Sequence, residues 1–177
     1  MRKIVLTCGL IAGAILAASM LIAQAFQDRI GFDRGVYVGY GAMIVAFVLV
    51  PVGVRAYRDR VAGGHVTIGR AIAVGLLITL VASACYVATW EVIYYRLAPD
   101  FGEKYAAHEI AKAKQAGATD AQIAERTRQM ADFNAMYRKP LVNIGFTFLE
   151  PLPVGLLFVL VTAGVLGRRR PAGEVVV

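Results

Sequence analysis

Four long stretches of apolar residues, separated by short charged segments, set the pattern of this chain. Each is about as long as the roughly 18 or more apolar residues that a helix needs to cross about 30 Å of hydrocarbon. None shows the alternation of apolar and polar positions that a membrane β-strand requires. We therefore predict an all-α integral membrane bundle that forms a single membrane domain over residues 1–177. The transmembrane helices are expected at about residues 4–26, 36–54, 71–95 and 141–166.

Prolines mark the expected interruptions of two of these helices. The second helix is expected to end at Pro51 and Gly53. In the fourth, Pro151 and Pro153 each remove a backbone donor, so the helix should kink there and free carbonyl groups near the middle of the membrane. Broken helices of this kind surround the binding sites of many transporters.

The segment 98–139, between the third and fourth apolar stretches, is the only sizeable part expected outside the bilayer. Its first helix should begin near Pro99 and stop at Gly117. Its second should open at Thr119, because Gln122 three residues later completes a capping-box pattern. The second helix has one apolar face, which must be covered by its partner helix, the membrane surface or another protein. We expect an antiparallel helical hairpin.

The positions of Lys and Arg predict the orientation of the chain. Residues 2–3, the loop from Arg55 to Arg70, and Arg168, Arg169 and Arg170 are short basic segments that an even number of crossings places on one side. Dense Lys and Arg mark the cytoplasmic side, so we expect both termini in the cytoplasm, with residues 98–139 on the outer side of a bacterial inner membrane. The three arginines of the short tail 167–177 are the expected contacts with anionic lipid. The first apolar stretch begins like a signal peptide but exceeds the usual apolar core of one, so we expect it to be retained.

The remaining composition indicates no reaction chemistry. The net charge of +7 is divided among short segments and forms no continuous stripe for nucleic acid. The glycine-rich loop 61–69 lacks the lysine of a phosphate-binding loop, and His65 and His108 have no companion metal ligands nearby. Cys8 and Cys85 lie at different depths, so no disulfide is expected. We therefore expect no catalytic residue, no cofactor, no metal and no enzymatic activity.

Small and aromatic residues gather on particular helices, and each group has two interpretations. Gly9, Gly13 and Ala17 form a stripe in the first helix that either packs within the bundle or serves as the seam of a homo-oligomer. Aromatic side chains crowd the outer ends of the second and third helices. They form either an aromatic belt at the membrane surface or a site for an aromatic ligand. These residues are Phe32, Tyr37, Tyr40, Tyr86, Trp90, Tyr94 and Tyr95.

Two carboxylates, Glu91 and Glu150, interrupt otherwise apolar helices, where a charged side chain costs about 2.5–3.5 kcal/mol at the membrane centre. Glu91 lies near the outer end of its helix, where Arg96 or a neighbouring tyrosine is the expected partner. Glu150 lies roughly 14 Å along its helix, near the midplane. Asn143, Thr147 and Glu150 follow at spacings of four and three, so they share one face.

The polar face of the fourth helix has two interpretations that stay open. In the first, Asn143, Thr147 and Glu150, with Glu91, form an intramembrane polar site. In the second, Glu150 is protonated and makes a structural hydrogen bond to Ser83 or Tyr86, which lie at a similar depth.

Several stretches of the chain resemble a known family. They are Gly9–Ala14 (GLIAGA), Ile68–Leu76 (IGRAIAVGL), Tyr86–Tyr95 (YVATWEVIYY), Arg138–Asn143 (RKPLVN) and Thr147–Gly155 (TFLEPLPVG). Together they resemble domain of unknown function family 4199, small bacterial multi-pass membrane proteins. The resemblance implies a bacterial inner-membrane protein with a helical insertion outside the cytoplasm, and it transfers no activity and no catalytic residue.

These observations favour a structural or interaction component of the cell envelope, whose 98–139 hairpin docks an envelope protein. The alternative is a small ion-coupled transporter or channel-like module that uses Glu150. A membrane enzyme is the least favoured class, because no catalytic set is present.

Overall fold

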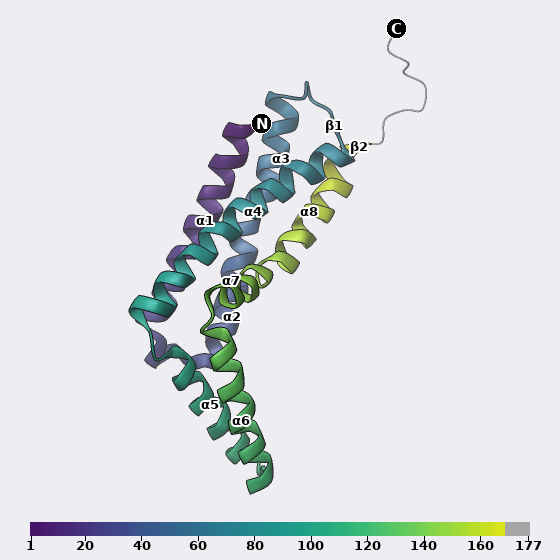
Figure 1. Cartoon of the computed structure of the whole chain (residues 1–177). Helices are drawn as coiled ribbons and strands as arrows, with labels where there is room; N and C mark the ends of the chain where they lie inside the picture. Colours follow the sequence, from purple (N-terminus) through teal and green to yellow (C-terminus); the bar gives the residue numbers. More distant parts are fainter. Residues whose placement is uncertain (169–177) are drawn as a thin grey trace.

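The protein, described here by a computed structural model over residues 1–168, is built almost entirely from α-helices (Figure 1). The helices are α1 (Arg2–Ala25), α2 (Gln27–Phe47), α3 (Leu49–Arg60), α4 (Ile68–Val92), α5 (Phe101–Gln115), α6 (Asp120–Tyr137), α7 (Pro140–Leu149) and α8 (Leu152–Leu166). A π-helical turn, η1 (Ile93–Leu97), extends α4. Two short strands are β1 (Val66–Thr67) and β2 (Gly167–Arg168).

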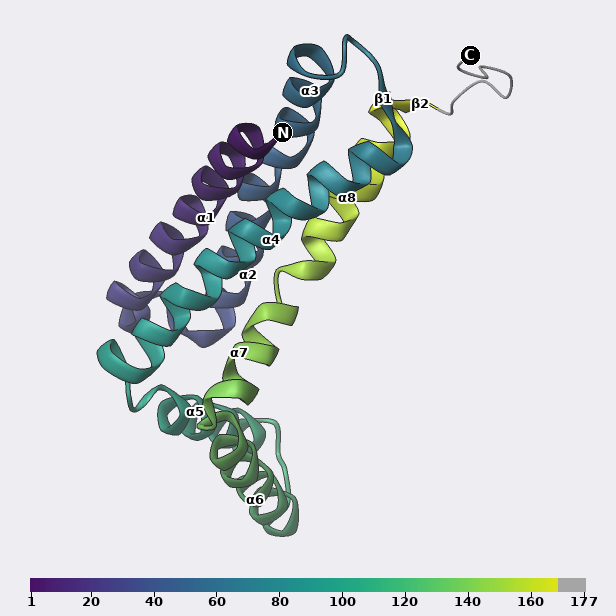
Figure 2. The same ribbon diagram turned by 45° about the horizontal axis from the view of Figure 1, so that its top comes forward.

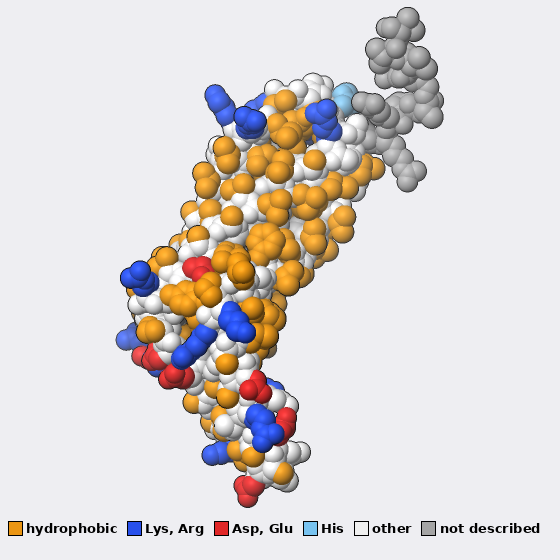
Figure 3. All heavy atoms as spheres, in the orientation of Figure 1, with side chains coloured by type: hydrophobic (Ala, Val, Ile, Leu, Met, Phe, Trp, Pro, Cys, Tyr) orange, Lys and Arg blue, Asp and Glu red, His pale blue; other side chains and the backbone are white. Residues whose placement is uncertain are grey.

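Within residues 1–168, four helical segments are long and apolar enough to cross a membrane, which confirms the predicted number. They are α1, α2 with α3, α4 with η1, and α7 with α8, at Arg2–Ala25, Gln27–Arg60, Ile68–Leu97 and Pro140–Leu166. Hydrophobic side chains cover the face of the bundle seen in Figure 3, while charged side chains gather at its ends and on the hairpin. This distribution is the one expected of a chain whose bundle lies in lipid.

Helix α4 is central in the bundle and contacts α1, α3, α7 and α8. Two glycines of α1 allow α4 to approach closely. A Cβ atom at Gly9 would lie 2.6 Å from Cβ of Val81, and one at Gly13 would lie 2.6 Å from Cβ of Cys85. Gly9 and Gly13 therefore pack within the bundle against α4, as the first of the two interpretations of this stripe expected. Both cysteines are free thiols, as predicted.

The prediction that the second transmembrane helix ends at Pro51 and Gly53 is wrong. The helix breaks earlier, at Val48, and then continues as α3 to Arg60. Pro51 lacks the N–H that would bond the carbonyl of Phe47, so the interruption falls one turn before the proline. Proline is tolerated in the first turn of a new helix, which explains why α3 continues through it.

The loop between α3 and α4 pairs with the end of α8, a contact that the sequence analysis did not predict. Strands β1 and β2 are parallel, with Val66 opposite Gly167 and Thr67 opposite Arg168. The start of α1, this loop and the end of α8 lie at the same end of the bundle (Figure 1), as the placement of Lys and Arg predicted. Arg169 and Arg170, two of the predicted lipid contacts, lie outside the described residues.

Helices α5 and α6 form the predicted hairpin, which projects from the opposite end of the bundle (Figure 2). The capping box is present: the Gln122 N–H bonds the Thr119 hydroxyl, and the Gln122 side chain bonds the Thr119 N–H. Contacts join the start of α5 to the end of α6, so the two helices are antiparallel. They join Gly102 to Asn134, Glu103 to Arg138, and Glu109 to Arg126. No side chain of either helix is fully buried.

Candidate binding cavity between the bundle and the hairpin

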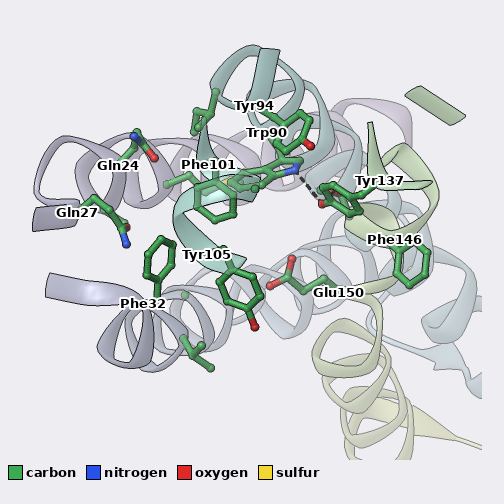
Figure 4. A pocket seen from close by; sticks show the side chains of 18 of the residues that line it. Gln24, Gln27, Phe32, Trp90, Tyr94, Phe101, Tyr105, Tyr137, Phe146 and Glu150 are labelled. Carbon is green, nitrogen blue, oxygen red and sulfur yellow. Dashed lines mark hydrogen bonds between the residues drawn. The ribbon is translucent and has the colours of Figure 1, made fainter. Parts of the chain in front are cut away.

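Glu150 lies at the break in the fourth transmembrane segment, between α7 and α8. Pro151 and Pro153 lack the N–H groups that would bond the carbonyls of Thr147 and Leu149, so the predicted interruption of the helix occurs here. Figure 2 shows α7 and α8 as separate helices joined at this point. The Glu150 side chain points from the break into a cavity (Figure 4).

The cavity has a volume of about 530 Å³ and lies where the end of the bundle meets the hairpin. Such a volume falls within the range of roughly 300–1,000 Å³ that is usual for small-molecule sites. Its walls come from α1, α2, α4, η1, α5, α6 and α7, and much of the lining is aromatic (Figure 4). The aromatic residues are Phe32, Tyr86, Trp90, Tyr94, Phe101, Tyr105, Phe133, Tyr137 and Phe146.

Glu150 is the one charged side chain among the residues described as lining the cavity. The Tyr86 hydroxyl donates a hydrogen bond of 2.9 Å to Oε2 of Glu150. Within residues 1–167, no Lys or Arg forms an ion pair with this carboxylate. Gln24 and Gln27 line the end of the cavity formed by α1 and the start of α2 (Figure 4).

A chain of hydrogen bonds connects α4, α6 and α7 along one wall. The Trp90 indole donates to the Tyr137 hydroxyl at 3.0 Å, and Tyr137 lies 3.2 Å from the Thr147 hydroxyl. Thr147 donates to Oδ1 of Asn143 at 3.2 Å, so Tyr137 supplies the proton of its bond with Thr147. Burial raises the pKa of Tyr137, which keeps this phenol protonated and able to donate. These hydrogen bonds hold the C-terminal end of α6 against the bundle.

The structure brings together three of the four predicted polar residues. Asn143, Thr147 and Glu150 share one face, as predicted, and Thr147 and Glu150 line the cavity. Asn143 is fully buried behind Thr147. Glu91 is not among the lining residues, so the structure does not join it to the other three.

The expected partners of the two carboxylates are found for Glu150 but not for Glu91. Glu150 bonds Tyr86, one of the two side chains that the structural interpretation named. The other, Ser83, is buried, and its hydroxyl has no hydrogen-bond partner among residues 1–168. Oε1 of Glu91 is also buried without a hydrogen-bond partner among residues 1–168. In particular, no hydrogen bond joins it to Arg96 or a tyrosine there.

Phe32 was among the aromatic residues named from the sequence, but its contact with the hairpin was not predicted. The Phe32 ring lies 5.6 Å from the ring of Phe101 and 5.5 Å from that of Tyr105, between ring centres. Gly31 has a φ of 72°, a left-handed conformation that favours glycine, and it redirects the chain just before Phe32. A glycine directly before an aromatic residue was the one local signal for this placement.

An ionic contact also joins the start of α2 to the hairpin. The Lys112 ammonium donates a hydrogen bond of 2.7 Å to the Asp33 carboxylate, and Nε2 of His108 lies 3.4 Å from the same carboxylate. The hydrogen bond to Asp33 raises the pKa of Lys112, so this side chain stays charged at neutral pH. Together with the packing of Phe32 against Phe101 and Tyr105, this contact holds α5 over the cavity.

A family model described as a protein of unknown function (DUF4199) matches residues 7–168. No curated protein and no solved structure matches the chain.

Proposed function

This chain belongs to the DUF4199 family of proteins of unknown function, and we propose that it is a membrane-embedded binding protein. Its ligand is a small, largely apolar molecule that occupies the cavity between the bundle and the hairpin. The observation that carries this proposal is a cavity of about 530 Å³ with aromatic walls and a single carboxylate, Glu150. The proposal develops the alternative in which Glu150, with Thr147 and Asn143, belongs to an intramembrane polar site.

The size of the cavity supports a ligand over a purely structural role. The volume of about 530 Å³ and the aromatic lining match those of small-molecule sites. A scaffold gains nothing from such a space at the junction of its two parts. A structural or docking component of the envelope, which acts through the surface of the hairpin, remains the alternative, and it predicts a cavity that takes up no small molecule.

For the surroundings of the protein we propose a bacterial inner membrane, with both termini in the cytoplasm. Arg2, Lys3 and the basic loop before α4 lie at the end of the bundle away from the hairpin (Figure 1), which supports this orientation. The hairpin and the cavity beneath it then lie toward the outer side of the membrane. The position suits a ligand that arrives from outside the cell or from the outer leaflet.

Trp90, the chain's only tryptophan, lines the cavity and therefore reports on its occupancy. The test titrates bromonaphthalene, an apolar aromatic whose bromine quenches indole fluorescence, into the purified protein in lipid nanodiscs. We expect saturable quenching of Trp90, in addition to the linear quenching that arises from probe dissolved in lipid.

Two glycines of α2 supply a matched pair of variants for this titration. Gly39 lines the cavity and Gly41 does not, and a Cβ atom at either position would meet open space. We expect Gly39→Leu to remove the saturable component by filling the cavity and Gly41→Leu to keep it. Linear quenching alone in the unmodified protein, or equal saturation in both variants, would contradict the proposal.

A further inference from the structure

We infer that the cavity selects an organic cation: an aryl- or alkylammonium whose charged head contacts Glu150 and whose apolar part lies among the aromatic rings. This inference rests on the proposed function, and it adds the chemical class of the ligand. Three properties of the cavity carry it: the charge of its lining, the use of its hydrogen-bond donors and the nature of its walls.

The charge of the lining favours a positive ligand. The chain has 19 Lys and Arg against 12 Asp and Glu, yet none of its described basic residues lines the cavity, whereas Glu150 does. An anion placed here would meet a carboxylate and no compensating cation among the described lining residues, so the two like charges would repel each other. A cation would instead supply the partner that Glu150 lacks within residues 1–167.

Four of the hydrogen-bond donors of the lining are used within the protein, whereas Gln24, Gln27 and Tyr105 donate no side-chain hydrogen bond among the described residues. Trp90 donates to Tyr137, Thr147 donates to Asn143, and Tyr86 donates to Glu150 itself. Tyr137 supplies the proton of its contact with Thr147, as argued above. Around Glu150 the cavity therefore offers a ligand a carboxylate acceptor and the faces of aromatic rings. That is the pattern expected of a site for a cation rather than for an anion that needs donors.

The aromatic walls complete the site. A cation within about 6 Å of the centre of a Trp or Tyr ring is attracted by the negative face of that ring, and the attraction grows when water is excluded. Trp90, Tyr105 and Tyr137 lie around the space into which Glu150 points (Figure 4). Quaternary ammonium groups are bound by aromatic residues in this way. The apolar part of the ligand then packs on the remaining phenylalanines.

The test compares two probes of the same shape that differ in charge. Benzyltrimethylammonium carries a quaternary nitrogen, and neopentylbenzene carries a carbon in its place. Each competes with bromonaphthalene in nanodiscs, and recovery of Trp90 fluorescence measures the displacement. Concentrations refer to probe bound to protein-free discs of the same lipid, which removes the difference in partitioning. We expect the ammonium to displace bromonaphthalene at a concentration at least about tenfold lower than the neutral probe.

Variants of the two intramembrane carboxylates show which one causes the preference for the ammonium probe. Glu150→Gln keeps an acceptor for Tyr86 but removes the charge, so we expect the tenfold preference to fall to about threefold or less. Glu91→Gln removes a carboxylate that does not line the cavity, and we expect the preference to remain.

Each outcome of this experiment has a distinct meaning. If bromonaphthalene quenches saturably but the two probes displace it equally, or if the preference survives in Glu150→Gln, the inference of a cation site is overturned while the proposed binding function stands. If no saturable quenching occurs, both fail. The comparison in the unmodified protein is decisive even if Glu150→Gln does not fold.

Discussion

At the scale of single residues, the pair of Tyr86 and Glu150 accounts for the placement of a carboxylate inside an apolar segment. Glu150 costs free energy in a membrane unless polar groups surround it. The helix break at Pro151 lets the side chain leave its helix, and the Tyr86 hydroxyl holds one of its oxygens at 2.9 Å. The other oxygen has no bond within the described chain, so the geometry fixes the carboxylate while leaving it able to contact a ligand.

We expect Tyr86→Phe and Glu150→Leu, each of which removes one partner, to act on stability through this one hydrogen bond. A double-mutant cycle, measured by unfolding in mixed micelles with increasing SDS, should give a coupling free energy of about 0.5–1.7 kcal/mol, the range of hydrogen bonds between membrane helices. The pair of Tyr86→Phe with Glu91→Gln should show no coupling, because Glu91 bonds neither residue. Additive effects of the first pair would show that the bond between Tyr86 and Glu150 does not form.

At the scale of helices, the hairpin is held on the bundle mainly by aromatic packing. Phe32 packs edge-on against the rings of Phe101 and Tyr105, and aromatic pairs of this kind contribute about 0.5–1.5 kcal/mol each beyond the area they bury. The ion pair of Asp33 with Lys112 is more than half exposed on both sides, at 59% and 58%. Exposed ion pairs contribute about 0–1 kcal/mol, so the packing dominates.

This comparison predicts which of two substitutions at the start of α2 loosens the hairpin more. Phe32→Ala should increase amide hydrogen exchange throughout α5, because α5 loses its main contact with α2. Asp33→Asn should increase it only slightly, and less so at high salt, where the ion pair is already screened. A larger effect of Asp33→Asn than of Phe32→Ala would mean that charge rather than packing holds the hairpin.

The helices could be predicted from the sequence to a far greater extent than the cavity. The four spans depend on the length of apolar stretches, and the start of α6 depends on the capping box of Thr119 and Gln122, both of which are local properties. The walls of the cavity bring together Phe32 and Phe101, which are far apart in the chain. A ring that lines a cavity and a ring in a membrane belt give the same sequence pattern. The pairing of β1 with β2 was missed for a similar reason, because it joins two short segments that are far apart in the chain.

At the scale of the whole molecule, charges are arranged so that one end of the bundle is basic and the other carries the hairpin. The basic end contains the start of α1 and the loop before α4 (Figure 1). If this end faces the cytoplasm, the cavity lies nearer the outer side of the membrane, as the hairpin does. The orientation therefore decides from which side the proposed ligand arrives.

Single cysteines test this orientation directly. His65 is exposed in the basic loop and Ala116 is exposed at the turn of the hairpin. We expect a membrane-impermeant maleimide to label Ala116→Cys in intact cells and His65→Cys only after lysis. The unmodified protein is the control, because Cys8 and Cys85 lie within transmembrane segments. The opposite pattern of labelling would reverse the proposed topology.

The measurement that tests the central claim most directly is the fluorine NMR spectrum of the protein with fluorotryptophan at its one tryptophan, Trp90. We predict a single resonance that shifts saturably as bromonaphthalene is added, with the same shift in Gly41→Leu and none in Gly39→Leu. A resonance that does not move in the unmodified protein, or that moves equally in Gly39→Leu, would show that the space beside Trp90 and Glu150 does not receive a ligand.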